Sequence, residues 1–330
     1  MNQNLIYNLP NTISTSNDIF NYVFRNFPEN DMWKLCIDRK DHWKGKNIYE
    51  KEDKGYLNGT LNGIEFIKQN IYTKFNFDFL IQLHTICVKD VINYKKKSYS
   101  TKFGPDENTH IYEGFIINKA TKLAKKEWHT EKLIYDEDSC PKTFTKEEGH
   151  REFISFYNTT TKRRISRIGW QPEDKCYSDR IQYAKDKLNN SIESYYKELF
   201  QAETNDKKLE AIVRLIRYFE ITHCFKDGNQ RTYNIMIQKL LIENGFYPCI
   251  LRDPIMFGGY YGVSELVDEV KEGILYFLSL TQNSSAIQLN RRIGNIHHLI
   301  NHSFDNIKRY LKSHLFLKNG INTTKYIKNL

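Results

Sequence analysis

Two apolar helical patterns on either side of a short polar turn most constrain the fold of this chain. In residues 209–219 the apolar side chains recur at the spacing of one helix face, and residues 235–242 are apolar almost throughout. The first pattern predicts an amphipathic helix that runs to His223, and the second predicts a helix buried on most of its sides. Gly245 and Pro248 follow the second run and predict its end. The apolar positions are Leu209, Ile212, Val213, Ile216 and Phe219, then Ile235, Met236, Ile237, Leu240, Leu241 and Ile242.

The rest of the sequence predicts a mostly helical chain with one short β-hairpin. Apolar residues at helical spacing indicate further helices in the segments 77–91, 113–130, 179–200 and 264–278. β-Branched residues, followed by the breakers Gly169 and Pro172, predict a hairpin within residues 158–172. The expected class is therefore all-α, a helical bundle with a short β-hairpin.

The pattern also predicts three regions along the chain. Residues 1–75 are rich in turn signals and predict an N-terminal accessory region. The helical patterns of residues 76–285 predict the core domain, and residues 286–330 predict a basic helical tail.

The amino-acid composition indicates the cellular compartment and the kind of partner to expect. The 330 residues carry 49 Lys and Arg against 40 Asp and Glu, a formal charge of +9, which favours acidic partners such as nucleotides. No run of eighteen apolar residues and no signal peptide is found, so we expect no membrane span and a cytoplasmic location. The six cysteines are scattered without a C-x-x-C pair, which favours a reducing compartment and argues against zinc.

The polar turn between the two helices carries groups suited to chemistry on phosphates. His223 can accept a proton near neutral pH and is the candidate general base for a hydroxyl nucleophile. Asp227 can ligate Mg²⁺, which binds through one or two carboxylates together with substrate phosphates. Gly228 permits a positive φ and a close approach of the backbone to a phosphate.

The residues after Gly228 predict an anion site at the start of the buried helix. The backbone N–H groups of Asn229, Gln230 and Arg231 have no intrahelical acceptor in the first turn of a helix. The guanidinium of Arg231 can add a bidentate contact to a phosphate.

Together these residues resemble the signature of the Fic/Doc family, H-P-F-x-(D/E)-G-N-G-R-x-x-R. Six defining positions match, and the helices before and after the motif also follow the family layout, so the resemblance spans about residues 76–282. The matching segment is His223-Cys224-Phe225-Lys226-Asp227-Gly228-Asn229-Gln230-Arg231-Thr232-Tyr233-Asn234. A spaced motif of this length in its expected context is a specific signal.

The resemblance implies a helical Fic fold whose hairpin is a target-positioning flap. It also implies transfer of the AMP part of ATP, with Mg²⁺, to a Ser, Thr or Tyr hydroxyl of a protein substrate. His223 would be the base and Asp227 the Mg²⁺ ligand. Asn229 and Arg231 would contact phosphates, and the residues from Gly228 through Gln230 would line the nucleotide. No nucleic acid partner is expected, and relatives of this kind suggest a bacterial effector or toxin that acts in a host cell.

Three positions depart from the signature and leave the donor open. Cys224 replaces a proline, Gln230 replaces a glycine that faces phosphate, and Asn234 replaces an arginine that clamps the γ-phosphate. Because the Doc branch also carries a bulkier residue at the Gln230 position, transfer of a γ-phosphoryl group is an alternative. Other members transfer UMP or phosphocholine. A binding module on a decayed Fic scaffold is the non-enzymatic alternative.

Overall fold

The computed structural model describes residues 7–10, 18–103, 121–124, 127, 144–147, 150–158, 163–171 and 177–281. The chain divides into two units after Thr281, and every described residue belongs to the first unit, Met1–Thr281. The tail predicted from residues 286–330 therefore lies outside the described residues, and its helical character stays a prediction.

Short helices and one long helix make up the N-terminal part of the described chain. Its helix α2 packs against α3 and α7, so this part contributes directly to the helical core. The elements are α1 (Ile19–Phe24), the 3-10 helices η2 (Glu29–Leu35), η3 (Arg39–Lys44) and η4 (Tyr49–Lys51), strand β1 (Asp53–Lys54) and α2 (Tyr56–Gln69).

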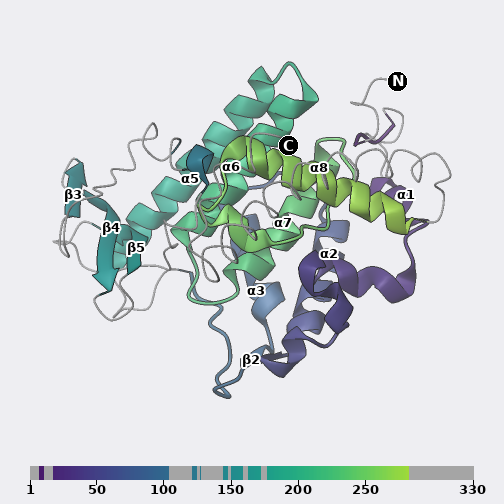
Figure 1. The fold of residues 1–330 in the computed structure, drawn as a ribbon, viewed down its shortest axis with the longest axis horizontal. Coiled ribbons are helices and arrows are strands. Elements are labelled where there is room, and N and C mark those ends of the chain that lie inside the picture. The colour runs from purple at the N-terminus through teal and green to yellow at the C-terminus, as the bar shows by residue number, and fades with distance from the viewer. Residues whose placement is uncertain are drawn as a thin grey trace, which may run out of the picture. The chain divides into compact units, whose positions relative to one another are not determined.

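A bundle of helices forms the centre of the unit (Figure 1). It consists of α3 (Phe77–Val88), α5 (Tyr177–Gln201), α6 (Asn205–Thr222), α7 (Asn229–Glu243), η6 (Pro254–Phe257) and α8 (Val263–Leu280). The helices α2, α3 and α6 all pack against α7. Every residue of α7 except Gln230 and Glu243 is buried, which confirms the burial predicted from its apolar pattern. The all-α class is confirmed as well.

Two small antiparallel sheets accompany the helices. Strand β1 pairs with β2 (Ile92–Asn93), and β3 (Phe144–Glu147), β4 (His150–Asn158) and β5 (Arg163–Gln171) form a sheet in that order. The predicted hairpin exists as β4 and β5, which pair antiparallel.

This sheet extends further toward the N-terminus than the prediction. The prediction began the hairpin at 158, whereas β4 ends there and a third strand precedes it. The run Phe153-Ile154-Ser155-Phe156-Tyr157 explains the difference, because aromatic and β-branched residues favour a pleated strand.

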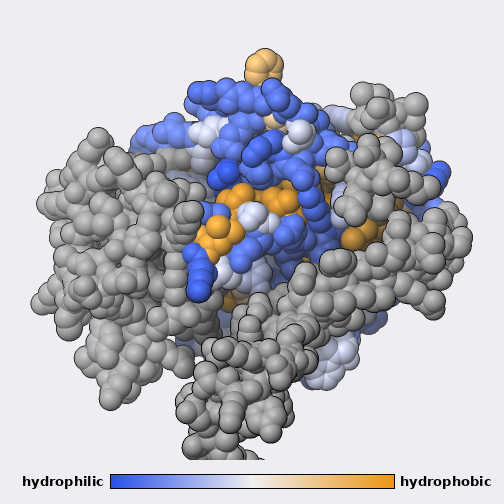
Figure 2. Space-filling model, turned by 45° about the horizontal axis from the view of Figure 1, so that its top comes forward, coloured by the Kyte–Doolittle hydropathy of each residue, from blue (hydrophilic) through white to orange (hydrophobic). Residues whose placement is uncertain are grey.

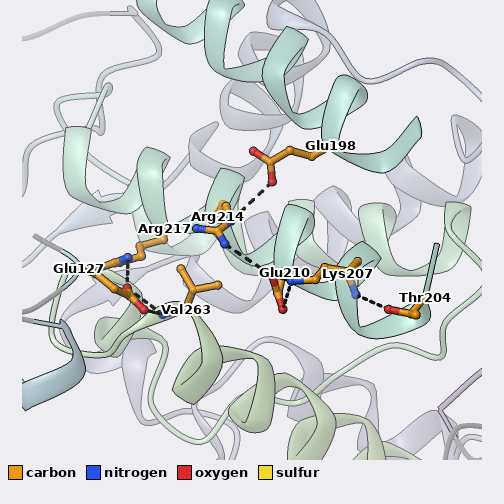
Figure 3. A network of polar contacts seen from close by, with 8 residues as sticks. All are labelled: Glu127, Glu198, Thr204, Lys207, Glu210, Arg214, Arg217 and Val263. Atoms are coloured by element: carbon orange, nitrogen blue, oxygen red, sulfur yellow. Dashed lines mark hydrogen bonds and ion pairs between the residues drawn. The ribbon is translucent and has the colours of Figure 1, made fainter. Parts of the chain in front are cut away.

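Side-chain contacts fix the N-termini of α6 and α8, and a partly buried ion pair joins the two helices. The Thr204 hydroxyl oxygen accepts a hydrogen bond from the Lys207 backbone N–H and caps α6. The Glu127 carboxylate accepts from Arg217 of α6 at 2.7 Å and from the Val263 backbone N–H at 2.9 Å (Figure 3). Because the Glu127 carboxylate lies at the N-terminus of α8, it also interacts favourably with the helix dipole.

The described surface is largely polar on one face, and the described cysteines are buried. On the face in Figure 2, hydrophilic residues cover most of the described surface, and hydrophobic atoms gather in a band near its centre. Across the described part of the chain, no helix combines the length and the hydropathy that crossing a membrane would require. The four described cysteines, Cys36, Cys87, Cys224 and Cys249, are all buried and unbonded to one another.

The contact between α2 and α3 provides a test of how far the N-terminal part is built into the core. A Cβ atom on Gly59 would overlap the carbonyl oxygen of Cys87, a backbone atom of α3. We expect Gly59→Ala to destabilise the protein by about 1–3 kcal/mol, because the two helices must move apart. The neighbouring exposed substitution Asn58→Ala is the control and should be neutral or slightly stabilising. Thermal unfolding of both variants checks this, and equal midpoints would contradict the packing.

Candidate active site

The turn between α6 and α7 begins at His223, which adopts an uncommon backbone conformation. His223 has φ 48° and ψ 55°, and its N–H donates to the Phe219 carbonyl at 2.9 Å, so it closes the C-terminus of α6. A left-handed conformation is rare for residues other than glycine, and such residues concentrate at functional sites. The imidazole is half-buried, which leaves part of it accessible from the surface of the unit.

Asn229 holds the interior of this turn. Its Oδ1 accepts from the Phe225 N–H at 2.9 Å, and its Nδ2 donates to the Phe225 carbonyl at 2.7 Å. The Tyr233 hydroxyl also donates to Oδ1, at 3.1 Å. The Asn229 side chain is thus bonded within the turn, which leaves its backbone N–H as the group that could contact a phosphate.

Cys224 occupies the position of the signature's proline without acting as a nucleophile. Its Sγ lies 2.8 Å from the Tyr233 hydroxyl inside the fold. Burial raises the pKa of the Cys224 thiol to about 12, so the thiol is neutral at physiological pH.

Asp227 and Gly228 lie where the turn meets α3. The Asp227 carbonyl accepts a hydrogen bond from His84 Nε2 at 2.8 Å. Gly228 has φ 73°, and a Cβ atom there would overlap Val88 Cγ1. Only glycine therefore combines the required backbone conformation with this close approach to α3.

The carboxylate of Asp227 fits a magnesium ion as a single protein ligand. The side chain is half-buried at the edge of the turn, and a carboxylate is the hard oxygen donor that Mg²⁺ prefers. In the described part of the chain, no three His, Cys, Asp or Glu residues gather as a metal site. A site built from one carboxylate and substrate phosphates does not need such a cluster.

The first turn of α7 offers backbone donors to an anion. The first i to i−4 hydrogen bond of this helix runs from the Thr232 N–H to the Gly228 carbonyl at 3.0 Å. The N–H groups of Asn229, Gln230 and Arg231 precede it, as in the helix N-termini that bind phosphates. The Gln230 side chain is half-buried beside these groups.

The structure places the Arg231 side chain inside the fold, which differs from the predicted phosphate contact. Its guanidinium is 3% exposed, donates to the Cys87 carbonyl at 3.1 Å and pairs with Asp53 at 3.4 Å. It also lies over the Tyr56 and Tyr99 rings, 4.1 and 5.3 Å from their centroids. These partners come from α2, α3, β1 and the segment after β2, so Arg231 joins α7 to the N-terminal part.

His84 is the residue at the site whose role the sequence did not reveal. It is fully buried in α3, and its ring stacks on Phe225 with 3.6 Å between centroids and 2° between planes. Burial lowers the pKa of His84 to about 4, so the imidazole is neutral at physiological pH. The only sequence signal was a histidine on the apolar face that Leu80, Leu83 and Cys87 form, and this pattern is compatible with a structural histidine.

The comparisons with known proteins find a similarity to one named transferase. No protein-family model matches the chain. The chain is 25% identical over 292 residues to the phosphocholine transferase AnkX of Legionella pneumophila subsp. pneumophila. This similarity covers 80% of the chain and 29% of the length of that relative. The relative's name describes a transferase, which is the class of activity that the Fic/Doc resemblance implies.

The internal position of Arg231 can be tested by unfolding. Arg231→Ala should lower the free energy of unfolding by about 3 kcal/mol, because it removes a buried cation and leaves Asp53 without its charged partner. Gln230→Ala, one residue earlier on α7, is the matched control and should change it by less than about 0.5 kcal/mol. Urea denaturation measures both. An unchanged midpoint for Arg231→Ala, together with weaker nucleotide binding, would instead support the predicted contact between Arg231 and a phosphate.

Proposed function

We propose that this protein is a transferase that moves a phosphate-containing group from a nucleotide donor to a hydroxyl of a protein substrate. The observation that carries the proposal is the geometry of the turn from His223 to Gly228. A histidine in a left-handed conformation and an aspartate lie at the two ends of one tight turn, directly before the N-terminus of α7. This arrangement combines a proton acceptor, a metal-capable carboxylate and an anion site.

The proposed reaction is a single displacement at phosphorus. The imidazole of His223 takes the proton of the hydroxyl, and the hydroxyl oxygen forms the new bond to phosphorus. The bond from phosphorus to the leaving phosphate of the nucleotide breaks, and the N–H groups at the start of α7 stabilise the charge on the phosphates. Bound Mg²⁺, held by Asp227, would supply charge neutralisation for the phosphates.

Phosphocholine from a nucleotide-linked choline is the group that we favour. The similarity to a phosphocholine transferase supports it. The two arginine positions of the expected triphosphate clamp support it as well. Arg231 matches the signature but is buried among other partners, and residue 234 is a buried asparagine. A triphosphate gains more from such cations than a diphosphate donor does, since it carries more negative charge.

Transfer of AMP from ATP is the second candidate. It is supported by the six positions of the signature that match, which include His223, Asp227 and Asn229. In both candidates the acceptor is a protein hydroxyl, and the free buried cysteines support action in a reducing compartment such as a cytoplasm.

Labelled donors distinguish the two candidates. We expect label from the choline of CDP-choline to appear on a protein target, and His223→Ala to lower the rate at least about a hundredfold, because it removes the proton acceptor. Lys207→Ala, an exposed change on α6, is the control and should transfer at the rate of the unchanged protein. Label from the α-phosphate of ATP in place of choline would select AMP. No transfer from any donor, or full activity of His223→Ala, would refute the proposal.

The metal ligand is tested by titration with magnesium. Asp227→Asn should raise the Mg²⁺ concentration needed for half-maximal transfer by about tenfold or more, since it removes the negative charge of the ligand. Glu65→Gln removes a carboxylate from the exposed face of α2 and serves as the control for charge. A Mg²⁺ dependence that is the same in both variants would remove Asp227 from the metal site.

A further inference from the structure

One face of α3 touches three parts of the turn and of α7. His84 contacts Phe225 and the Asp227 carbonyl. Val88, one turn later, lies against Gly228, and the Cys87 carbonyl accepts from Arg231 at 3.1 Å. The signature segment, residues 223–234, therefore packs against α3. The two residues that the His84 hydrogen bond joins are 143 residues apart in the sequence.

The hydrogen bond between His84 and the Asp227 carbonyl determines which ring nitrogen of His84 carries the proton. The partner of Nε2 is a carbonyl oxygen, which can only accept, so Nε2 must be the donor. The other nitrogen, Nδ1, is buried and has no hydrogen-bond partner among the described residues. His84 is thus a neutral donor aimed at one backbone atom of the turn.

Several other polar groups of the turn are bonded within the signature segment. Asn229 bonds both backbone groups of Phe225, and the Thr232 N–H and hydroxyl both donate to the Gly228 carbonyl. The Asp227 carbonyl instead depends on a side chain from another helix. Because a buried unpaired carbonyl is costly, loss of the His84 donor would leave this carbonyl free to rotate away.

The imidazole ring of His84 makes a second contact with the turn, because it stacks on Phe225. Phe225 is fully buried and lies parallel to the imidazole, with the edge of Phe103 against it. The ring thus contacts the turn at Phe225 and the Nε2–H contacts it at Asp227, so both positions pack against α3.

We propose that His84 is the positioning residue of the candidate active site: its Nε2–H and its ring hold the turn so that the Asp227 carboxylate and the N-terminus of α7 are set for the donor's phosphates before the donor binds. The inference rests on the proposed function for its effect on catalysis. Its effect on the turn itself is independent of any activity.

Two substitutions separate the donor from the ring. His84→Phe keeps an aromatic ring and removes the donor, whereas His84→Gln places an amide N–H near the position of Nε2 and removes the ring. We expect kcat for transfer from CDP-choline to fall about tenfold or more in His84→Phe, with KM for the protein acceptor unchanged. His84→Gln should recover most of this loss, and the exposed change Gln82→Ala, also on α3, should match the unchanged protein.

Hydrogen exchange supplies a readout that needs no activity. The amides of Phe225 through Asn229 should exchange faster in His84→Phe than in the unchanged protein, and His84→Gln should restore protection. In the unchanged protein, nitrogen NMR of labelled histidine should show His84 as the Nε2–H tautomer.

The outcomes are distinct. Equal kcat and equal exchange in His84→Phe and the unchanged protein would overturn the inference, as would an Nδ1–H tautomer. A His84→Gln variant as impaired as His84→Phe would also overturn it, because returning an N–H donor to this position would then not restore the turn. If the unchanged protein transfers no group from any donor, the proposed function fails, and the exchange and tautomer measurements still decide the role of His84.

Discussion

The burial of α7 on every side is the constraint on which the rest of the structure depends. A buried helix cannot leave its polar side chains unpaired, since desolvation without a partner is costly. Gln238 bonds the backbone of Cys249, and Lys239 donates to the Ile71 carbonyl at 2.9 Å. Arg231 reaches the Cys87 carbonyl. The polar residues of α7 therefore tie it to segments on both sides of it in the sequence, and the apolar residues supply the burial.

The same constraint explains why the candidate site lies at the N-terminus of α7. Because α7 is held on most sides, its first N–H groups have fixed positions. The turn that leads into α7 is held in place for the same reason. His223 and Asp227 gain their geometry from this turn. The side chain of Arg231, which follows them, packs inside the fold between α7, Cys87 and Asp53.

Sequence periodicity was sufficient for the helices that carry the site. The spacing in 209–219 and 235–242 predicted α6 and α7, and the glycine at 228 marked the turn between them. Sequence periodicity was a weaker predictor for the sheet of β3, β4 and β5. The run at 153–157 is short and apolar, and the period alone does not show whether such a run is a strand or a helix. The third strand, β3, had no periodic signal of its own.

By itself the sequence determined the order of groups in the turn: a histidine, a carboxylate, a glycine and a helix start, in a spacing that resembles one family. Tertiary structure alone decided what those groups face. The 3.6-residue period places residues on a helix face, but it does not say which distant segment covers that face. The inward position of Arg231 and the contact of His84 with Asp227 depend on how α2, α3 and α7 pack together, and no local pattern encodes that packing.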